Sequence, residues 1–432
     1  MRTRLTAVLG SFVLVLAAVP AADARSLADK LSAFLTSNTL GPFLENQPVV
    51  DPITPIIERE AIRGIDFPAP PSSPAFAYTY NPELQVFERS SGSLGPEFAE
   101  RAQTAGVGRF TLGFSYLFAD LRDVDGRNFG KRIGSAYVCG SPTCTVVNPG
   151  TGTEVNSIGK FLGRHFSLMT HVFSFSGTYG ITDRWDVNLL VPLLYSELHL
   201  DGRGSSALID PASGGIIAGS AVSTAARFND NAFGVGDILV RTKYRFNDGP
   251  GPLFAGAFTV RTPSGNEDDF QGLGDVTLTP AIIGTKNWGP HELHGSLGVE
   301  VDAQDLDRSR ARYGIGGVIQ PIEKVGILLD VVGSSSFVDD EFTVSAGGRI
   351  PQVFESDFQN TDFIRDPNTT RAFTPTGNVV GFVPRSDIVD LNVGLKVNIF
   401  STAIAYVGAI VPLTKDGLRA DVIPAGAVEY TF

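Results

Sequence analysis

The sequence predicts an all-β protein, a transmembrane antiparallel β-barrel of about twelve strands, from three observations. Apolar and polar residues alternate along most of the chain after Gly106, the gaps between the alternating runs are short and long in turn, and the chain ends on an aromatic residue. A period of two puts successive side chains on opposite faces of a strand. Short turns at one rim and longer loops at the other, with an even strand count, are typical of a bacterial outer-membrane barrel.

Composition sets the class of protein. Of the 432 residues 43% are apolar, which is too many for a disordered chain, and 19% are charged, which is too many for a helical membrane bundle. The 34 Lys and Arg against 46 Asp and Glu give a net charge of −12. No nucleic-acid partner is therefore expected, because such proteins must neutralise phosphates.

Residues 1–24 have the organisation of an export signal peptide. Arg2 and Arg4 make a positive start, residues 5–19 form an uncharged apolar stretch, and residues 22–24 form a small-x-small cleavage site. No later stretch approaches the roughly 18 uninterrupted apolar residues of a spanning helix. The mature product is then expected to be soluble in the periplasm, secreted or a β-barrel.

Residues 25–105 do not follow the alternation and are expected to form a separate N-terminal segment. Leu27, Leu31 and Leu35 fit a short amphipathic helix, and the eight prolines between residues 42 and 74 forbid regular structure there. The prediction is a Pro-rich periplasmic segment, partly helical or disordered. The alternative is a plug that enters the barrel lumen and gates it.

Residues 106–432 are predicted to form the barrel. In the first run Phe110, Leu112, Phe114, Tyr116 and Phe118 share one face. Most runs have about ten residues, the length that crosses a bilayer as a tilted strand. The twelve runs are 107–118, 167–179, 185–196, 235–246, 253–262, 275–284, 291–301, 310–319, 325–334, 387–400, 403–412 and 420–432.

The connections between the runs are of two kinds. Tight turns follow the even-numbered runs and are expected in the periplasm: 180–184, 247–252, 285–290, 320–324 and 401–402. Longer or more polar connections follow the odd-numbered runs: 119–166, 197–234, 263–274, 302–309, 335–386 and 413–419. A soluble sandwich would also alternate, but it would not sort its loops in this way.

The final strand predicts how the barrel is assembled. Gly426, Val428, Tyr430 and Phe432 lie on one face, and Phe432 is the last residue. A terminal aromatic on an amphipathic strand resembles the signal by which outer-membrane barrels are handed to the barrel-assembly machinery. Closure would remove the unpaired strand edges that lipid cannot satisfy.

Cys139 and Cys144 are predicted to form a disulfide that staples a Gly- and Pro-rich loop. An exported protein meets an oxidising compartment, where such a pair usually closes. The alternative, a metal site, would need two more ligands, and the sequence places none nearby. No metal and no cofactor are expected.

Inward-facing charges define the predicted lumen. An Arg or Lys facing lipid at the bilayer midplane would cost about 2–4 kcal/mol, so these charges should point inward. Strand direction places the acidic residues near the outer rim: Asp237, Asp275, Glu300, Asp302, Asp330, Asp390 and Asp421. The basic residues of the lumen are Arg109, Arg241, Lys243, Arg245 and Lys396. An acidic mouth would disfavour anions, and a basic constriction would orient a polar group on a mostly apolar solute. The alternative is that these charges pair across a closed lumen.

Aromatic and histidine residues are further candidates for functional roles. Trp185, Tyr195, Tyr244, Tyr406 and Tyr430 are expected in the aromatic girdles at the membrane interfaces. The five His form no metal-binding pattern, and His291 and His294 are expected to be solvated rim residues.

One segment resembles a known family. Residues 175–193, FSGTYGITDRWDVNLLVPL, resemble the second hairpin of outer-membrane proteins described as transporters of the meta-pathway of phenol degradation. Further matches are Glu100-Arg101-Ala102, Gly236-Asp237-Ile238, Lys243-Tyr244 and residues 262–265, so the resemblance spans roughly residues 95–432. It implies a bacterial outer-membrane barrel and supplies no catalytic residues.

The predicted function is a passive outer-membrane channel for small organic solutes, aromatic or otherwise apolar, and not an enzyme. One alternative is a structural or adhesive barrel with a closed lumen, whose loop carboxylates bridge lipopolysaccharide through divalent ions. A second is an outer-membrane lipase, because His165 and Ser167 share a strand face. Expected partners are outer-membrane lipid, lipopolysaccharide, the assembly machinery and the solute.

Overall fold

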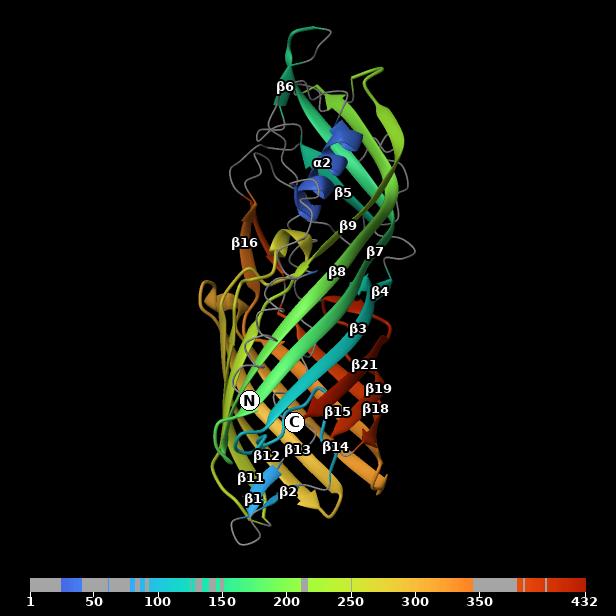
Figure 1. Cartoon of the computed structure of the whole chain (residues 1–432). Helices are drawn as coiled ribbons and strands as arrows, with labels where there is room; N and C mark the ends of the chain where they lie inside the picture. Colours follow the sequence, from blue (N-terminus) through green and yellow to red (C-terminus); the bar gives the residue numbers. More distant parts are fainter. Residues whose placement is uncertain are drawn as a thin grey trace, which may run out of the picture.

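The alternating runs fold into one antiparallel sheet that closes on itself in the computed structural model of the chain (Figure 1). The structure describes residues 25–40, 61, 78–81, 86–89, 93–124, 126–128, 134–139, 145–147, 151–210, 217–249, 251–344, 379–383, 385–400 and 402–432. The predicted signal peptide and the prolines between residues 42 and 74 lie outside the described residues.

Twelve strands form the barrel wall, and each overlaps one predicted run, so the prediction of a twelve-stranded barrel is confirmed. They are β3 (Phe110–Val124), β7 (Glu154–Gly180), β8 (Trp185–Ile209), β10 (Leu239–Arg245), β11 (Leu253–Arg261), β12 (Thr277–Trp288), β13 (His291–Asp302), β14 (Arg310–Ile322), β15 (Val325–Ser336), β18 (Asp387–Phe400), β19 (Ala403–Pro412) and β21 (Ile423–Thr431). Each pairs antiparallel with its neighbours, and β10 pairs with β8 to close the wall.

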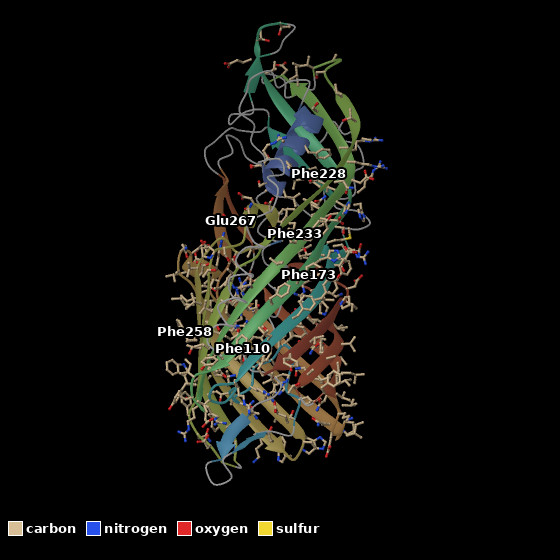
Figure 2. All side chains as sticks on the ribbon, viewed as in Figure 1. Phe110, Phe173, Phe228, Phe233, Phe258 and Glu267 are labelled. Atoms are coloured by element: carbon tan, nitrogen blue, oxygen red, sulfur yellow. The ribbon has the colours of Figure 1, made fainter. Side chains whose placement is uncertain are left out.

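The outward face of β8 marks the apolar band. Odd-numbered residues point outward, and from Trp185 to Tyr195 they are apolar or aromatic, whereas Glu197, His199, Asp201 and Arg203 above them are polar. Ten residues at about 3.4 Å each, tilted near 45°, give about 24 Å of height, the height of the lipid-facing band of such barrels. Phe110 and Phe258, labelled in Figure 2, belong to the same band and are 36% and 40% exposed. The barrel therefore lies in the outer membrane.

The wall is much taller on one side than the loop prediction allowed. Residues 119–166 and 197–234 were expected to be connections, but β7 and β8 continue as long strands and β9 (Val222–Val235) pairs with β8 above β10 (Figure 1). Shorter strands pair along the same extension: β4 (Arg127–Asn128), β5 (Gly134–Cys139) and β6 (Thr145–Val147). The strands continue to pair above the apolar band, where most of their outward residues are polar. The apolar pattern that marks contact with lipid ends there, although the strands do not.

Helix α2 (Leu27–Leu40) packs against this extension. Leu27 and Leu31 are buried, and the ring of Phe34 lies 5.3 Å from that of Phe228 on β9. The amide of Leu27 donates to Asp269 in the turn η2 (Glu267–Asp269) at 2.6 Å. This part of the N-terminal segment therefore contacts the outer end of the barrel, not the expected periplasmic end. No helix in the described ranges is long and apolar enough to cross a membrane.

The remaining elements are small. β1 (Tyr78–Asn81) pairs with β2 (Val86–Arg89), and β16 (Asp340–Val344) pairs with β17 (Val379–Val383) inside the predicted connection 335–386. The turn η3 (Leu306–Arg308) links β13 and β14, and β20 (Leu418–Ala420) pairs with β3. Between β16 and β17, residues 345–378 lie outside the described part of the chain.

The C-terminal residues form the seam between the last and first strands. The amide of Phe432 donates to the carbonyl of Phe110 at 2.8 Å, and their rings stack 6.1 Å apart. Val428, Tyr430 and Phe432 are exposed on the outer face. Their predicted role with Gly426 as an assembly signal stays a prediction.

Candidate functional site

Residues 93–105 lie inside the barrel. All are buried except half-buried Glu100. A chain that contacts β8, β12 and β18 at once must lie in the lumen, because these strands stand on different sides of the wall. Its contacts are Ala102 N to Thr285 Oγ1 of β12 at 2.8 Å, Ala105 N to Asp186 Oδ2 of β8 at 3.1 Å, and Lys396 Nζ of β18 to Pro96 O at 2.5 Å. We call residues 93–105 the lumen segment.

An ion pair ties the lumen segment to β18. Lys396 Nζ lies 3.0 Å from Glu97 Oε2 and 3.8 Å from Glu429 Oε1 on β21, and the Lys396 side chain is 1% exposed. Removing one partner of a buried pair leaves an uncompensated charge, which is strongly destabilising. Lys396, predicted as a basic lumen residue, thus holds the segment in place.

A second charged network joins the segment to β13 and β15. Arg101 Nη1 lies 3.4 Å from Glu292 Oε2, Glu292 Oε1 lies 3.5 Å from His294 Nδ1, and His294 Nε2 lies 2.9 Å from Asp330 Oδ1. The Arg101, Glu292 and His294 side chains are 0% exposed. The expectation that His294 is a solvated rim residue is therefore wrong. Asp330 lies among the residues that hold the segment.

Two glycines make room for this network. Gly95 has φ +69°, and a Cβ there would lie 2.7 Å from Nη1 of Arg101. At Gly316 on β14 a Cβ would lie 2.2 Å from Asp330 Oδ1 and 2.8 Å from His294 Nε2. Glycine is required at Gly95 by both its positive φ and the close approach of the guanidinium.

Tyr406 belongs to the same network. The expectation that it lies in an aromatic girdle is therefore wrong. It is 5% exposed, its hydroxyl donates to Asn392 Oδ1 at 2.5 Å, and its ring meets Phe98 edge-on at 6.1 Å. Asn392 in turn donates to Asp330 at 3.2 Å. By contrast, Trp185, Tyr244 and Tyr430 are 42%, 49% and 43% exposed on the outer face.

The lower end of the lumen segment is held beside β8 and β10. Thr104 donates to the carbonyl of Asp183 at 2.7 Å, and Asp186 lies 3.8 Å from Lys243 Nζ. Arg245 donates to the same Asp183 carbonyl at 3.0 Å. Lys243 and Arg245, two of the predicted basic residues, therefore lie beside the C-terminal end of the lumen segment.

Above these contacts lies a cavity of about 180 Å³, which we call the arginine cavity. It lies between residues 98–100 and the inner faces of β10 to β15 and β18, and Arg241, Arg261 and Arg312 line it. Of these, only Arg241 had been singled out from the sequence. Arg261 and Arg312 sit on the inward faces of β11 and β14, so the alternation that identified Arg241 could have identified them.

The predicted acidic rim is mostly neutralised. Four carboxylates pair with arginines: Asp275 with Arg308 at 2.9 Å, Glu300 with Arg312 at 2.8 Å, Asp421 with Arg122 at 3.3 Å, and Asp390 with Arg419. Asp330 Oδ1 lies 2.9 Å from Nε2 of His294. Two others accept backbone amides: Asp237, and Asp302, which binds Gln304 N at 3.0 Å and Asp305 N at 2.9 Å. These carboxylates are therefore paired with neighbouring strands and rim loops, in part as the alternative of paired lumen charges expects, but not across the lumen.

Two loop carboxyls outside the strands are electrostatically shifted. Burial raises the pKa of Asp275, with a further contribution from Asp302 and opposition from Arg308. Burial also raises the pKa of Asp268 in η2, assisted by Asp29 of α2. Both shifts favour the uncharged carboxyl relative to an aspartate in water.

Asp237 fixes the connection between β11 and β12 across the top of the lumen. Its carboxylate accepts the amides of Gly265 at 3.1 Å and Leu273 at 2.8 Å, and Phe270 of this connection is 0% exposed with φ 57°.

Bonds to a charged acceptor each contribute about 1.5–3 kcal/mol. We expect Asp237→Ala to destabilise the connection by at least about 2 kcal/mol, measured as faster proteolysis within residues 262–276. Asp305→Ala, which changes an exposed turn, is the control. Equal rates of proteolysis in the two variants would show that Asp237 does not hold the connection.

Other predicted residues lie apart from the lumen or outside the description. Arg109 sits at the periplasmic edge, where it donates to the carbonyl of Phe432 at 3.4 Å. Cys144 is not among the described residues, so the disulfide with Cys139 stays a prediction. Contacts with lipopolysaccharide and with the assembly machinery also stay predictions. Within the described ranges, no group of three or more His, Cys, Asp and Glu could hold a metal ion.

The arrangement expected of a lipase is not formed at Ser167. Its hydroxyl donates to Asp120 Oδ1 at 2.7 Å. A nucleophilic serine would instead donate its proton to a histidine base. Ser167 thus belongs to the polar outer face just above the apolar band.

Comparison with known proteins places the chain in a family. A family model described as "Putative MetA-pathway of phenol degradation" matches residues 148–398, more than half of the chain. An outer-membrane channel from Pseudomonas putida F1 is 12% identical, with 77% of this chain and 98% of that chain covered and a TM-score of 0.42. A Pseudomonas aeruginosa FadL homologue is 9% identical, with 75% and 89% covered and a TM-score of 0.30. The Pseudomonas putida toluene transporter TodX is 11% identical, with 75% and 89% covered and a TM-score of 0.26. No curated protein matches the sequence.

Proposed function

Because the chain belongs to the MetA-pathway of phenol degradation family and folds as a closed outer-membrane barrel, we propose that it carries small organic solutes, aromatic or otherwise apolar, passively across that membrane. Its general class is that of outer-membrane transporters. The solute and its route through the barrel are what we propose. Passive flow needs only a path whose lining is favourable enough to enter and weak enough to leave.

One observation carries the proposal. The chain's own residues 93–105 occupy part of the lumen, and the arginine cavity leaves an open space beside them. A barrel used only as a scaffold could fill its interior with side chains from the wall. Here the filling is a separate stretch of chain, held by ion pairs and hydrogen bonds. Such a stretch can leave or shift without opening the wall.

The proposed route passes along the lumen segment. Its polar contacts, Lys396 with Glu97 and Arg101 with Glu292, are the bonds that must break or move for a solute to pass. In a low-dielectric lumen each ion pair is either formed or replaced by other partners, because a buried charge without a partner is costly. The segment is thereby proposed to act as a plug.

Uptake by intact cells tests the transport proposal. A Gram-negative host that expresses the protein should accumulate radiolabelled phenol or toluene, at low external concentration, several-fold faster than the same host with an empty vector. A labelled hydrophilic sugar of similar mass is the control solute. Equal uptake of both aromatic solutes by the two hosts would overturn the proposal and leave the structural or adhesive barrel as the better account.

A further inference from the structure

The charged residues that line the arginine cavity are balanced in number. Three are arginines, Arg241, Arg261 and Arg312, and three are carboxylates, Glu100, Glu300 and Asp390. Glu300 lies 2.8 Å from Arg312 and 3.8 Å from Arg261. Asp390 is paired with Arg419. An ion that entered would disturb these pairs and would lose its own hydration, so the cavity favours an uncharged occupant.

Part of the same lining is apolar. It is formed by Phe98 of the lumen segment, Leu239, Ala257, Ala281, Val332 and Ile388. The cavity volume of about 180 Å³ exceeds the roughly 150 Å³ of an apolar cavity that is known to hold a benzene molecule. The space therefore fits a single ring with one small substituent.

One hydroxyl group on this lining has no bonding partner. Thr277 begins β12 and is 2% exposed, and its Oγ1 makes no hydrogen bond within the part of the chain that the structure describes. Its side chain lies on the inward face of β12, as does that of Thr285, which bonds the lumen segment. Staggered χ1 rotamers turn either the hydroxyl or the methyl group of a threonine toward the space. A buried hydroxyl without a partner costs free energy, which a bound polar group would recover.

We propose that the arginine cavity binds small uncharged ring compounds that carry one hydrogen-bonding group, such as an alcohol or a carboxamide, and that Thr277 binds this group. The proposal rests on the proposed transport function, since it names the solutes that the lumen prefers. The hydroxyl of Thr277 can both donate and accept, so an alcohol or an amide satisfies it, whereas a hydrocarbon leaves it unpaired. A carboxylate or an ammonium group would bring a net charge into a lining whose charges are balanced.

Titration with four probes of one ring size tests the class of ligand. Purified full-length barrel in detergent, at about pH 7, is titrated with 4-fluorobenzyl alcohol, 4-fluorotoluene, 4-fluorobenzoate and 4-fluorobenzylamine, and binding is followed by fluorine NMR. The substituents of these probes are, in order, hydrogen-bonding and neutral, apolar, anionic and cationic. The alcohol should bind at least about fivefold more tightly than each of the other three.

Variants of Thr277 test the residue. Thr277→Val removes the hydroxyl, keeps nearly the same shape, and should weaken binding of the alcohol about five- to tenfold while 4-fluorotoluene binds as before. Thr277→Ser keeps the hydroxyl and should retain most of the affinity for the alcohol.

A filled cavity provides the control for partition into detergent. Ala281→Phe occupies the apolar part without altering any charge and should weaken binding of the alcohol and of 4-fluorotoluene at least about tenfold. Signal that persists in this variant measures partition into the micelle. Heat-modifiable mobility in gels verifies that each variant is a folded barrel.

The outcomes distinguish this inference from the transport proposal. Equal affinity for the alcohol and 4-fluorotoluene, tighter binding of either ion, or alcohol binding that neither Thr277→Val nor Ala281→Phe changes, overturns the site even where cells take up aromatic solutes through the protein. Preferential alcohol binding that depends on Thr277, in a protein that gives cells no added uptake, supports the site and overturns transport instead.

Discussion

Deletion of residues 25–105 is expected to raise the single-channel conductance of the purified barrel in planar bilayers by at least about tenfold. The reason is that residues 93–105 fill the lumen through contacts with β8, β12 and β18. Without them, inward charges such as Lys396 and Glu292 would face water, and ions could pass between them. Discrete steps that appear only after deletion would identify the lumen segment as the plug.

A reversible lock tests the same role without removing any part of the chain. The backbone of Ala102 lies beside the side chain of Thr285, with 2.8 Å between amide and hydroxyl. Ala102→Cys with Thr285→Cys, in a chain with Cys139 and Cys144 changed to Ser, should form a disulfide that suppresses conductance and aromatic uptake until a reductant is added. Flux that is unaffected by oxidation and by deletion alike would rule out a plug role for the segment.

Replacing Arg101 is expected to have the second largest effect. Arg101→Ala leaves Glu292 buried beside His294 and Asp330 with its cation removed. Breaking a buried ion pair from one side costs about 3–5 kcal/mol. The population of barrels with an undocked lumen segment should rise by about 10²–10⁴-fold. Hydrogen exchange of residues 93–105 measures this as faster exchange of their amides.

The matched control for Arg101 is Arg184, which is also paired with a carboxylate but on the surface. Arg184→Ala breaks the exposed pair with Asp248, and its effect on stability should be below about 1 kcal/mol. The double variant Arg101→Ala with Glu292→Gln should recover part of the protection, because it removes the orphaned charge. Unchanged exchange in Arg101→Ala would mean that the segment is held by its backbone contacts alone.

Much of the barrel could be predicted from the sequence because alternation is a local property. Side chains on β3, such as Phe110 and Phe114, face lipid wherever the strand stands in the sheet, and their period of two is visible in the chain. The height of the wall was missed for the same reason. Above Tyr195 the outward residues of β8 become polar, so the strand continues without the apolar pattern by which it had been recognised.

The functional residues divide in a similar way. Arg241 and Lys396 were predicted to face inward from their strand positions, and both are buried in the lumen. Their partners were not predictable, since Glu97 lies some three hundred positions from Lys396 in the chain. Arg101 was visible as part of a family-like motif, Glu100-Arg101-Ala102, but the motif indicates neither where the residue lies nor what it binds.

The sequence by itself determined the strand count, the lipid-facing faces and the class of protein, because each depends on the order of polar and apolar residues along one strand. Only the tertiary structure decided what fills the lumen and how its charges are used. Closure of the wall brings β8, β13 and β18 around one stretch of chain and sets carboxylates beside inward cations such as Lys396 and Lys243. Sequence order cannot supply those distances, so an inward Asp330 could be assigned to a rim when it belongs to the network that holds the lumen segment.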